Sequence, residues 1–210
     1  MSAPQPYRRS LLRQERSLNT RRMILRAATQ LWSTRDFDAT TIEELCAAAG
    51  IGRSTFYLYF ESKERLLIAL ASETARGVAD DVDTWTDAGT VDEAMGVFVD
   101  GLVRRMESVP RTLAALVMRQ VAAANVSPRP VADDPILFHD IFTGIVRAAQ
   151  RRGEVRSDLD ARDVGEALAG MTLDALERWA SGDPERTLRE IIEFRISLVL
   201  DAIRTSTARR

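Results

Sequence analysis

Apolar side chains recur every three or four residues along almost the whole chain, which is the spacing of one face of an α-helix. No stretch alternates apolar and polar residues for long enough to predict a strand. The pattern therefore predicts an all-α protein. The first helix is expected to follow the capping residues Asn19 and Thr20 and to end near Arg35. We expect the other helices at about 41–48, 53–59, 62–84, 91–108, 110–125, 134–152, 161–181 and 184–206.

Turn-forming residues stand between these helices. Gly50 separates two short helices, and Pro110 suits the first turn of the helix that it opens. Before the last helix, Gly182 is expected to end one helix, Asp183 to cap the next and Pro184 to begin it.

Two short helices joined by a glycine-containing turn are the pattern of a helix-turn-helix. Phe56 and Phe60 lie four residues apart on the second of them, so we expect both to face inward. The opposite face is left for a partner, and its hydroxyl and guanidinium groups can bond base edges and phosphates. This face comprises Ser54, Thr55, Tyr57 and Tyr59, and the guanidinium is that of Arg53 at the start of the helix.

Charge is distributed unevenly along the chain. The formal net charge is −2, which by itself argues weakly against nucleic acid. The first 60 residues nevertheless carry nine arginines and five acidic residues, a net charge of +4. The predicted helix-turn-helix thus lies in the basic part of the chain.

At these residues the chain resembles the TetR family of transcriptional regulators. The resemblance rests on the run from Thr41 to Leu67, above all on Phe56-Tyr57-x-Tyr59-Phe60 followed by Ser62-Lys63-Glu64. It implies an N-terminal three-helix DNA-binding domain joined to a C-terminal helical bundle for effector binding and dimerisation. Two departures stand out: Gly52 where the family often has Ser, which removes one expected hydroxyl contact, and Cys46 where Ala is usual.

The resemblance also implies roles for individual residues. Thr41 would cap the first motif helix at a phosphate, and Tyr59 and Lys63 would hold phosphates. The major groove would be faced by Arg53, Ser54, Thr55 and Tyr57. The implied function is that of an effector-responsive homodimer, usually a repressor, on a palindromic operator in double-stranded DNA. An activator or effector-independent regulator of the same fold is the alternative.

This layout predicts three regions: a basic flexible arm at 1–18, the helix-turn-helix domain at 19–65, and an effector-binding and dimerisation domain at 66–206. The arm either is simply solvated or contacts DNA. In the third region, apolar residues with a few polar ones suggest a pocket for a hydrophobic or amphipathic small molecule. The candidate lining residues are Phe98, Leu102, Met106, Leu113, Val117, Gln120, Phe138, Phe142, Met171 and Thr172. Gln120 lies on an apolar stripe, where it either satisfies a neighbouring helix or orients the effector. Thr172, His139 and Arg105 are further candidate polar groups of this pocket.

The last predicted helix is apolar nearly all round, so one core cannot cover it. We therefore expect a homodimer through the last two helices of each subunit, in a four-helix interface.

Several classes of function are disfavoured by the composition. Cys46 cannot close an intrachain disulfide, and His139 alone cannot form a His-rich metal site, so we expect no metal and no cofactor. Cys46 is either a small buried packing residue or a redox group, and His139 either a structural residue or a ligand contact. Because the longest apolar runs are about six residues, against the ~18 that span a bilayer, and no secretory signal is visible, we expect a cytoplasmic protein without a membrane partner. A helical-bundle enzyme is disfavoured, because Glu-x-x-His pairs and a Gly-rich phosphate loop are missing from the sequence.

Overall fold

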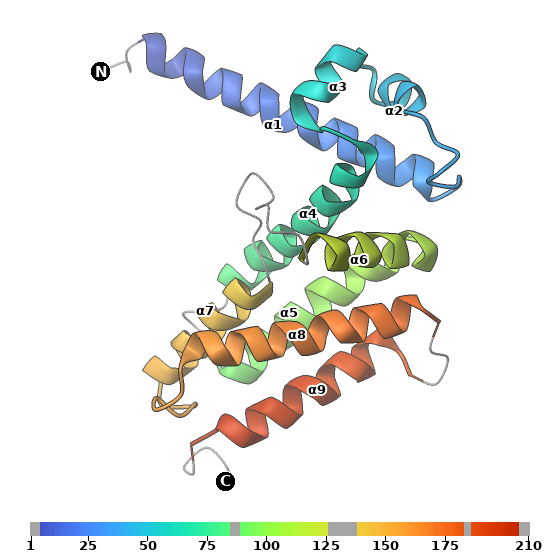
Figure 1. Cartoon of the computed structure of the whole chain (residues 1–210). Coiled ribbons are helices and arrows are strands. Elements are labelled where there is room, and N and C mark those ends of the chain that lie inside the picture. The colour runs from blue at the N-terminus through green and yellow to red at the C-terminus, as the bar shows by residue number, and fades with distance from the viewer. Residues whose placement is uncertain (1–4, 85–88, 126–137, 183–185, 206–210) are drawn as a thin grey trace. The chain divides into compact units, whose positions relative to one another are not determined.

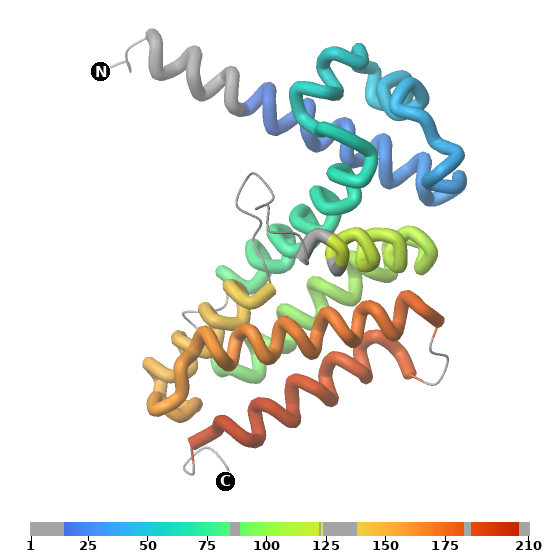
Figure 2. The backbone as a smooth tube through the Cα atoms, in the orientation of Figure 1, coloured from blue at the N-terminus to red at the C-terminus, as the bar shows by residue number. Residues whose placement is uncertain are grey.

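The structure is a computed structural model of the chain, and it describes residues 5–84, 89–125, 138–182 and 186–205. Its described elements are all helices, as predicted (Figure 1). They are α1 (Gln5–Trp32), α2 (Ile42–Ala49), α3 (Arg53–Tyr59), α4 (Lys63–Asp83), α5 (Val91–Glu107), α6 (Arg111–Asn125), α7 (Phe138–Arg151), α8 (Ala161–Ala180) and α9 (Leu188–Ile203). The chain divides into an N-terminal unit, Met1–Ala69, and a C-terminal unit, Leu70–Arg210. The division falls within α4, whose backbone is continuous through it (Figure 2).

The first helix begins earlier than the sequence pattern indicated. It starts at Gln5, so the segment expected as a flexible arm is helical from that residue onward. The reason is that Thr20 does not cap a helix: its Oγ1 donates to the carbonyl of Arg16, 2.9 Å away, one turn back within α1. Pro6 stands in the first turn, where its missing N–H costs no helical hydrogen bond.

The last helix, in contrast, begins later than predicted. Helix α9 starts at Leu188 and is capped by Thr187, whose Oγ1 accepts from the Glu190 backbone N–H while the Glu190 carboxylate accepts from that of Thr187. This reciprocal capping box satisfies two free N–H groups at once, so it sets the start of the helix. The caps predicted at Asp183 and Pro184, and the helix start predicted at 134, lie outside the described residues.

The core of the C-terminal unit is formed by helices α5 to α9, together with Val78 and Val82 of α4. Helix α8 packs against α6, α7 and α9, while α5 packs against α6, α7 and α9. Figure 1 shows α8 and α9 running side by side. Phe98 of α5 and Phe142 of α7 are fully buried with ring centroids 4.3 Å apart, and Phe138 lies edge-on to Phe98 at 5.7 Å. An aromatic cluster therefore joins α5 to α7.

Helices α7 and α8 approach each other closely at Gly165. A Cβ added there would overlap Oγ1 of Thr143 and would lie 2.9 Å from the backbone N of Thr143 and from the carbonyl O of His139. A glycine inside this helix thus has a packing reason.

Across the described residues, helices long and apolar enough to cross a membrane are absent.

Candidate nucleic-acid interface

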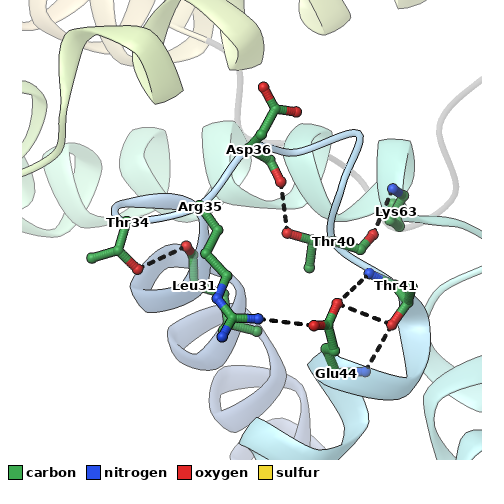
Figure 3. A network of polar contacts seen from close by, with 8 residues as sticks. All are labelled: Leu31, Thr34, Arg35, Asp36, Thr40, Thr41, Glu44 and Lys63. Atoms are coloured by element: carbon green, nitrogen blue, oxygen red, sulfur yellow. Dashed lines mark hydrogen bonds and ion pairs between the residues drawn. The ribbon is translucent and has the colours of Figure 1, made fainter.

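The first helix of the motif is capped reciprocally at its start. Thr41 Oγ1 accepts from the Glu44 backbone N–H at 3.2 Å, and the Glu44 carboxylate accepts from the Thr41 backbone N–H at 2.8 Å. Arg35 donates to the same carboxylate at 2.8 Å (Figure 3). The hydrogen bonds from Thr41, reinforced by the charge of Arg35, lower the pKa of Glu44. This network fixes the N-terminus of α2, where free backbone N–H groups favour an anion.

Gly50 makes the turn between the two helices. Its φ of +66° is a left-handed conformation that side chains other than glycine rarely adopt. The N–H groups of Gly50 and Ile51 donate to the carbonyls of Ala47 and Cys46, at 3.2 and 3.0 Å, and so close the end of α2. The turn predicted at this glycine is confirmed.

Helix α3 has the two faces that its spacing predicted. Phe56 and Phe60 are buried, with their ring centroids 6.0 Å apart. Arg53, Ser54 and Tyr57 are exposed, whereas Thr55 and Tyr59 are half-buried. Gly52 precedes the helix in an extended conformation and makes no side-chain cap. The start of α3 therefore has no hydroxyl group at this position, as the replacement of the family's usual Ser by Gly indicated.

Leu58 was not among the predicted interface residues, although it is the most exposed large apolar side chain described, at 82%. It stands two residues after Phe56 and two before Phe60, and two residues correspond to about 200° around a helix, so it faces away from the inward pair. The same spacing that identified the inward phenylalanines therefore contained the signal for Leu58.

Lys63 is engaged within the N-terminal unit. Its Nζ donates to the carbonyls of Phe37, at 2.9 Å, and Thr40, at 2.7 Å, and lies 4.7 Å from the centroid of the Phe37 ring. Thr40 in turn donates its hydroxyl to the carbonyl of Asp36 at 2.7 Å (Figure 3). The ammonium expected to hold a phosphate is thus committed to the loop between α1 and α2.

Arg53 at the start of α3 also has a partner that the sequence pattern did not reveal. Its Nη1 lies 2.7 Å from the Glu43 carboxylate of α2. A hydrogen bond with Tyr57, followed by the negative charge of Glu43, raises the pKa of the Arg53 guanidinium further above its usual value. The arrangement links α2 to the outward face of α3.

No group of three or more His, Cys, Asp or Glu side chains in the described residues is placed to hold a metal ion. Cys46 is buried, and desolvation raises the pKa of its thiol, which favours the unreactive protonated form.

Comparison with known proteins identifies the family. Residues 24–70 match the model of bacterial regulatory proteins, tetR family. The HTH-type transcriptional repressor KstR2 of Rhodococcus jostii is 27% identical over an alignment of 199 positions, and the match covers 86% of this chain and 89% of that protein. The chain belongs to the TetR family.

Other TetR-family relatives extend the likeness over most of the chain. The crystal structure of Thermus thermophilus FadR, a TetR-family transcriptional repressor in complex with lauroyl-CoA, is 25% identical with a TM-score of 0.69. The match covers 90% of this chain and 98% of that one. The fatty acid metabolism regulator protein of Bacillus subtilis is 20% identical over 182 residues, covering 86% of this chain and 93% of that protein.

In this TetR-family regulator, the predicted effector-pocket residues differ in burial. Val117, Gln120, Phe138 and Met171 are half-buried. The others are buried: Phe98, Leu102, Met106, Leu113, Phe142 and Thr172.

Two of the polar groups suggested for this pocket are used elsewhere. The Thr172 hydroxyl donates to the carbonyl of Leu168 in its own helix at 2.8 Å. The Arg105 guanidinium, another suggested polar handle, is bonded to Asp81 at 2.7 Å.

A groove of about 590 Å³ lies on the surface between α8 and α9. Of the predicted pocket residues, Met171 lines it. Phe194 and Leu198 line it as well and are half exposed. The remaining lining residues are Gly170, Asp174, Arg178, Arg186, Ile191 and Arg195. The last helix was predicted to be apolar nearly all round, and its side chains Phe194 and Leu198 indeed lie on the outer face.

Proposed function

We propose that this TetR-family regulator is a repressor that binds a palindromic operator as a homodimer and is released by an amphipathic small molecule. The observation that carries the proposal is the outward face of α3, where Arg53, Ser54 and Tyr57 project from a helix anchored by Phe56 and Phe60. Such a helix fits the major groove of B-form DNA. The repressor names of the relatives support the direction of regulation. We place the protein in the cytoplasm because this function requires access to the chromosome.

Base edges are read, in this proposal, by the first turns of α3. The Arg53 guanidinium suits guanine, and the methyl group of Thr55 suits the methyl of thymine. The exposed Leu58 offers a second apolar contact of this kind. Thr41 and the α2 N-terminus are placed against one phosphate and Tyr59 against another, so that these residues fix the register while α3 supplies the sequence preference.

Dimerisation occurs through α8 and α9. The exposed apolar side chains Phe194 and Leu198 on α9, next to the groove that Met171 lines, support this assignment. A second copy would remove these side chains from water in a four-helix arrangement. The dimer then holds two α3 helices for the two half-sites of a palindrome.

The effector is proposed to be a fatty acyl thioester or a related acyl compound. Two relatives support this class, because one is a fatty acid metabolism regulator and the other was crystallised with lauroyl-CoA. The cluster of Phe98, Phe138 and Phe142 in the C-terminal unit is apolar enough to suit an acyl chain. An activator or effector-independent regulator remains the alternative output of the same fold.

Release of DNA requires that the effector bind two arrangements of the dimer with different affinity. Helix α4 is the element through which effector binding would change the arrangement of the dimer, because its backbone belongs to both units. A shift of α4 would change the spacing of the two recognition helices in the dimer.

The test begins with in vitro selection from a random duplex library by the full chain, followed by binding of the selected duplex measured by fluorescence anisotropy. We expect a palindrome, and we expect lauroyl-CoA to weaken binding by about 5- to 150-fold. Coenzyme A alone should have no effect. Val117→Trp should abolish the response and leave effector-free binding nearly intact. Absence of enrichment would refute DNA binding, whereas enrichment without any response to lauroyl-CoA would refute only the effector class.

A further inference from the structure

An acidic side chain stands on the side of the motif that is proposed to meet DNA. Glu43 is the second residue of α2, and its carboxylate lies 2.7 Å from Nη1 of Arg53, the first residue of α3. Both side chains remain more than half exposed, at 57% for Glu43 and 62% for Arg53. A carboxylate near a phosphate backbone opposes binding, so this pair calls for an explanation in terms of recognition.

The contribution of this ion pair to folding stability does not explain its presence. Exposed ion pairs of this kind contribute roughly 0 to 1 kcal/mol to folding, because solvent screens the charges and two long side chains lose freedom. Helix α2 is already fixed by its capping box and by Gly50. The ion pair is therefore dispensable for the fold of the motif.

The Arg53 guanidinium is held from the preceding helix. The Glu43 carboxylate lies 2.7 Å from its Nη1, so one part of the guanidinium faces α2. Tyr57, one turn further along α3, is on the same exposed face, and its ring packs edge-on against the buried Phe56 with centroids 5.5 Å apart. The orientation of Arg53 is therefore limited by the ion pair with Glu43.

This restriction changes what an arginine can recognise. A free guanidinium can turn toward any nearby phosphate, which gives affinity without sequence preference. A guanidinium with one part of its planar fork occupied by a carboxylate retains other N–H donors in a fixed direction. Guanine presents two acceptors, O6 and N7, in the major groove, and they match such a pair of donors.

We propose that Glu43 is a positioning residue that holds Arg53 for a guanine and makes its use on phosphates unfavourable. The proposal rests on the proposed binding of DNA through α3. Glu43 acts in two ways: its geometry directs Arg53, and its charge weakens binding to DNA of arbitrary sequence. Specificity at one base pair of each half-site therefore depends on a residue that does not itself contact a base.

The experiment repeats the in vitro selection with four full-length variants in parallel with the wild type. Arg53→Ala identifies the base pair that Arg53 reads. Glu43→Gln removes the charge and keeps the size, and Glu43→Asp keeps the charge and shortens the reach. Glu61→Gln is the matched control, because Glu61 is exposed and paired with Arg65, so the change in net charge is the same. Thermal unfolding of each variant verifies that the motif is folded.

We expect Arg53→Ala and Glu43→Gln to lose preference at the same single base pair, by about fivefold or more, with the other positions unchanged. Glu43→Asp should lose preference there without any gain in affinity for random duplex DNA. Glu43→Gln should gain affinity for random duplex DNA. Glu61→Gln should keep the wild-type profile.

Two results would overturn the inference while leaving the proposed function intact. One is a Glu43→Gln profile that keeps the wild-type preference at the position lost in Arg53→Ala. The other is an Arg53→Ala profile that loses no position at all. Failure of the wild type to enrich any sequence would instead remove the proposed function, and with it the basis of the inference.

Discussion

Arg105 of α5 donates from Nη1 to the Asp81 carboxylate of α4 at a distance of 2.7 Å. The same guanidinium donates to the carbonyl O of Gly101, at 2.9 Å, and of Gly77, at 2.8 Å. The two glycines make room for it, because an added Cβ would lie 2.6 Å from Arg105 Nε at Gly77 and 2.8 Å from Asp81 Oδ2 at Gly101. This partly buried clamp joins α4 to α5 within the C-terminal unit.

The clamp predicts a pH-dependent contribution to stability. The hydrogen bond from Arg105 lowers the pKa of Asp81 below its ordinary value, against the effect of burial. The folded-state pKa therefore lies below the unfolded value of about 3.9, so the stabilisation is present above that pH and is lost as the pH falls through the folded-state pKa. We expect Asp81→Asn to lower the free energy of unfolding by about 1 to 3 kcal/mol at pH 7.

The measurement is urea unfolding of both proteins between pH 7 and pH 3, at one protein concentration because a dimer is expected. The difference between wild type and Asp81→Asn should be constant above about pH 5 and should shrink below about pH 4. A difference that stays constant down to pH 3 would show that the Asp81 charge does not stabilise the fold.

Two glycines of the α7–α8 region should respond to alanine in opposite ways. Gly165→Ala places a Cβ against the backbone of His139 and Thr143, so it should cost about 1 to 3 kcal/mol of stability. Gly144→Ala, in α7, meets nothing within 4 Å and should stabilise by roughly 0.5 to 1 kcal/mol, because alanine favours a helix interior over glycine. Denaturant unfolding of the two variants gives the signs directly. Equal effects of the two changes would contradict the close helix approach at Gly165.

Replacement of Lys63 can weaken DNA binding in two ways, which differ in their effects on salt dependence and on stability. A lost phosphate contact would lower the slope of log affinity against log salt by about 0.9. A lost anchor of the α1–α2 loop would lower stability instead. Because the ammonium is bonded to the carbonyls of Phe37 and Thr40, we expect Lys63→Met to lower the unfolding temperature and to change the salt slope on random duplex DNA by less than about half that amount. If Lys63→Met instead lowered the salt slope by the full amount of about 0.9 and left the unfolding temperature unchanged, Lys63 would be a phosphate contact.

The proposed dimer interface can be tested with two leucines of equal exposure. Leu198 of α9 and Leu18 of α1 are both 52% exposed. Leu198→Glu should give a monomer in sedimentation velocity and should abolish tight operator binding, because the two half-sites are no longer held in register. Leu18→Glu, with the same change of charge, should remain dimeric. A Leu198→Glu variant that sediments as a dimer would place the interface elsewhere.

Residues whose roles follow helical periodicity could be predicted from the sequence. Phe56 and Phe60 are buried as their spacing indicated, and Gly50 adopts the positive φ that its place between two helices required. Periodicity reports only which face of its own helix a residue occupies. It therefore could not reveal the contact between Glu43 and Arg53, which are ten residues apart and meet only because the turn brings α3 back beside α2.

Contacts between side chains and backbone carbonyls could not be predicted from the sequence either. The partners of Lys63 are carbonyls of a loop more than 20 residues earlier in the chain, and no residue type in that loop signals them. The start of α1 was predicted wrongly for a related reason. Thr is a residue type that often caps helices, yet the Thr20 hydroxyl donates to the carbonyl of Arg16 within a continuous helix.

Sequence-specific recognition of DNA by α3 is the central claim, and one binding measurement tests it most directly. Anisotropy titrations compare the selected duplex with a scrambled duplex of equal length and composition at the same salt concentration, for the wild type, Thr55→Ala and Tyr57→Ala. We expect the wild type to prefer the selected duplex by a factor of at least about 1,000. Each variant should lose about 5- to 150-fold on that duplex and little on the scrambled one. Equal affinity of the wild type for both duplexes, or equal losses of the variants on both, would contradict the claim.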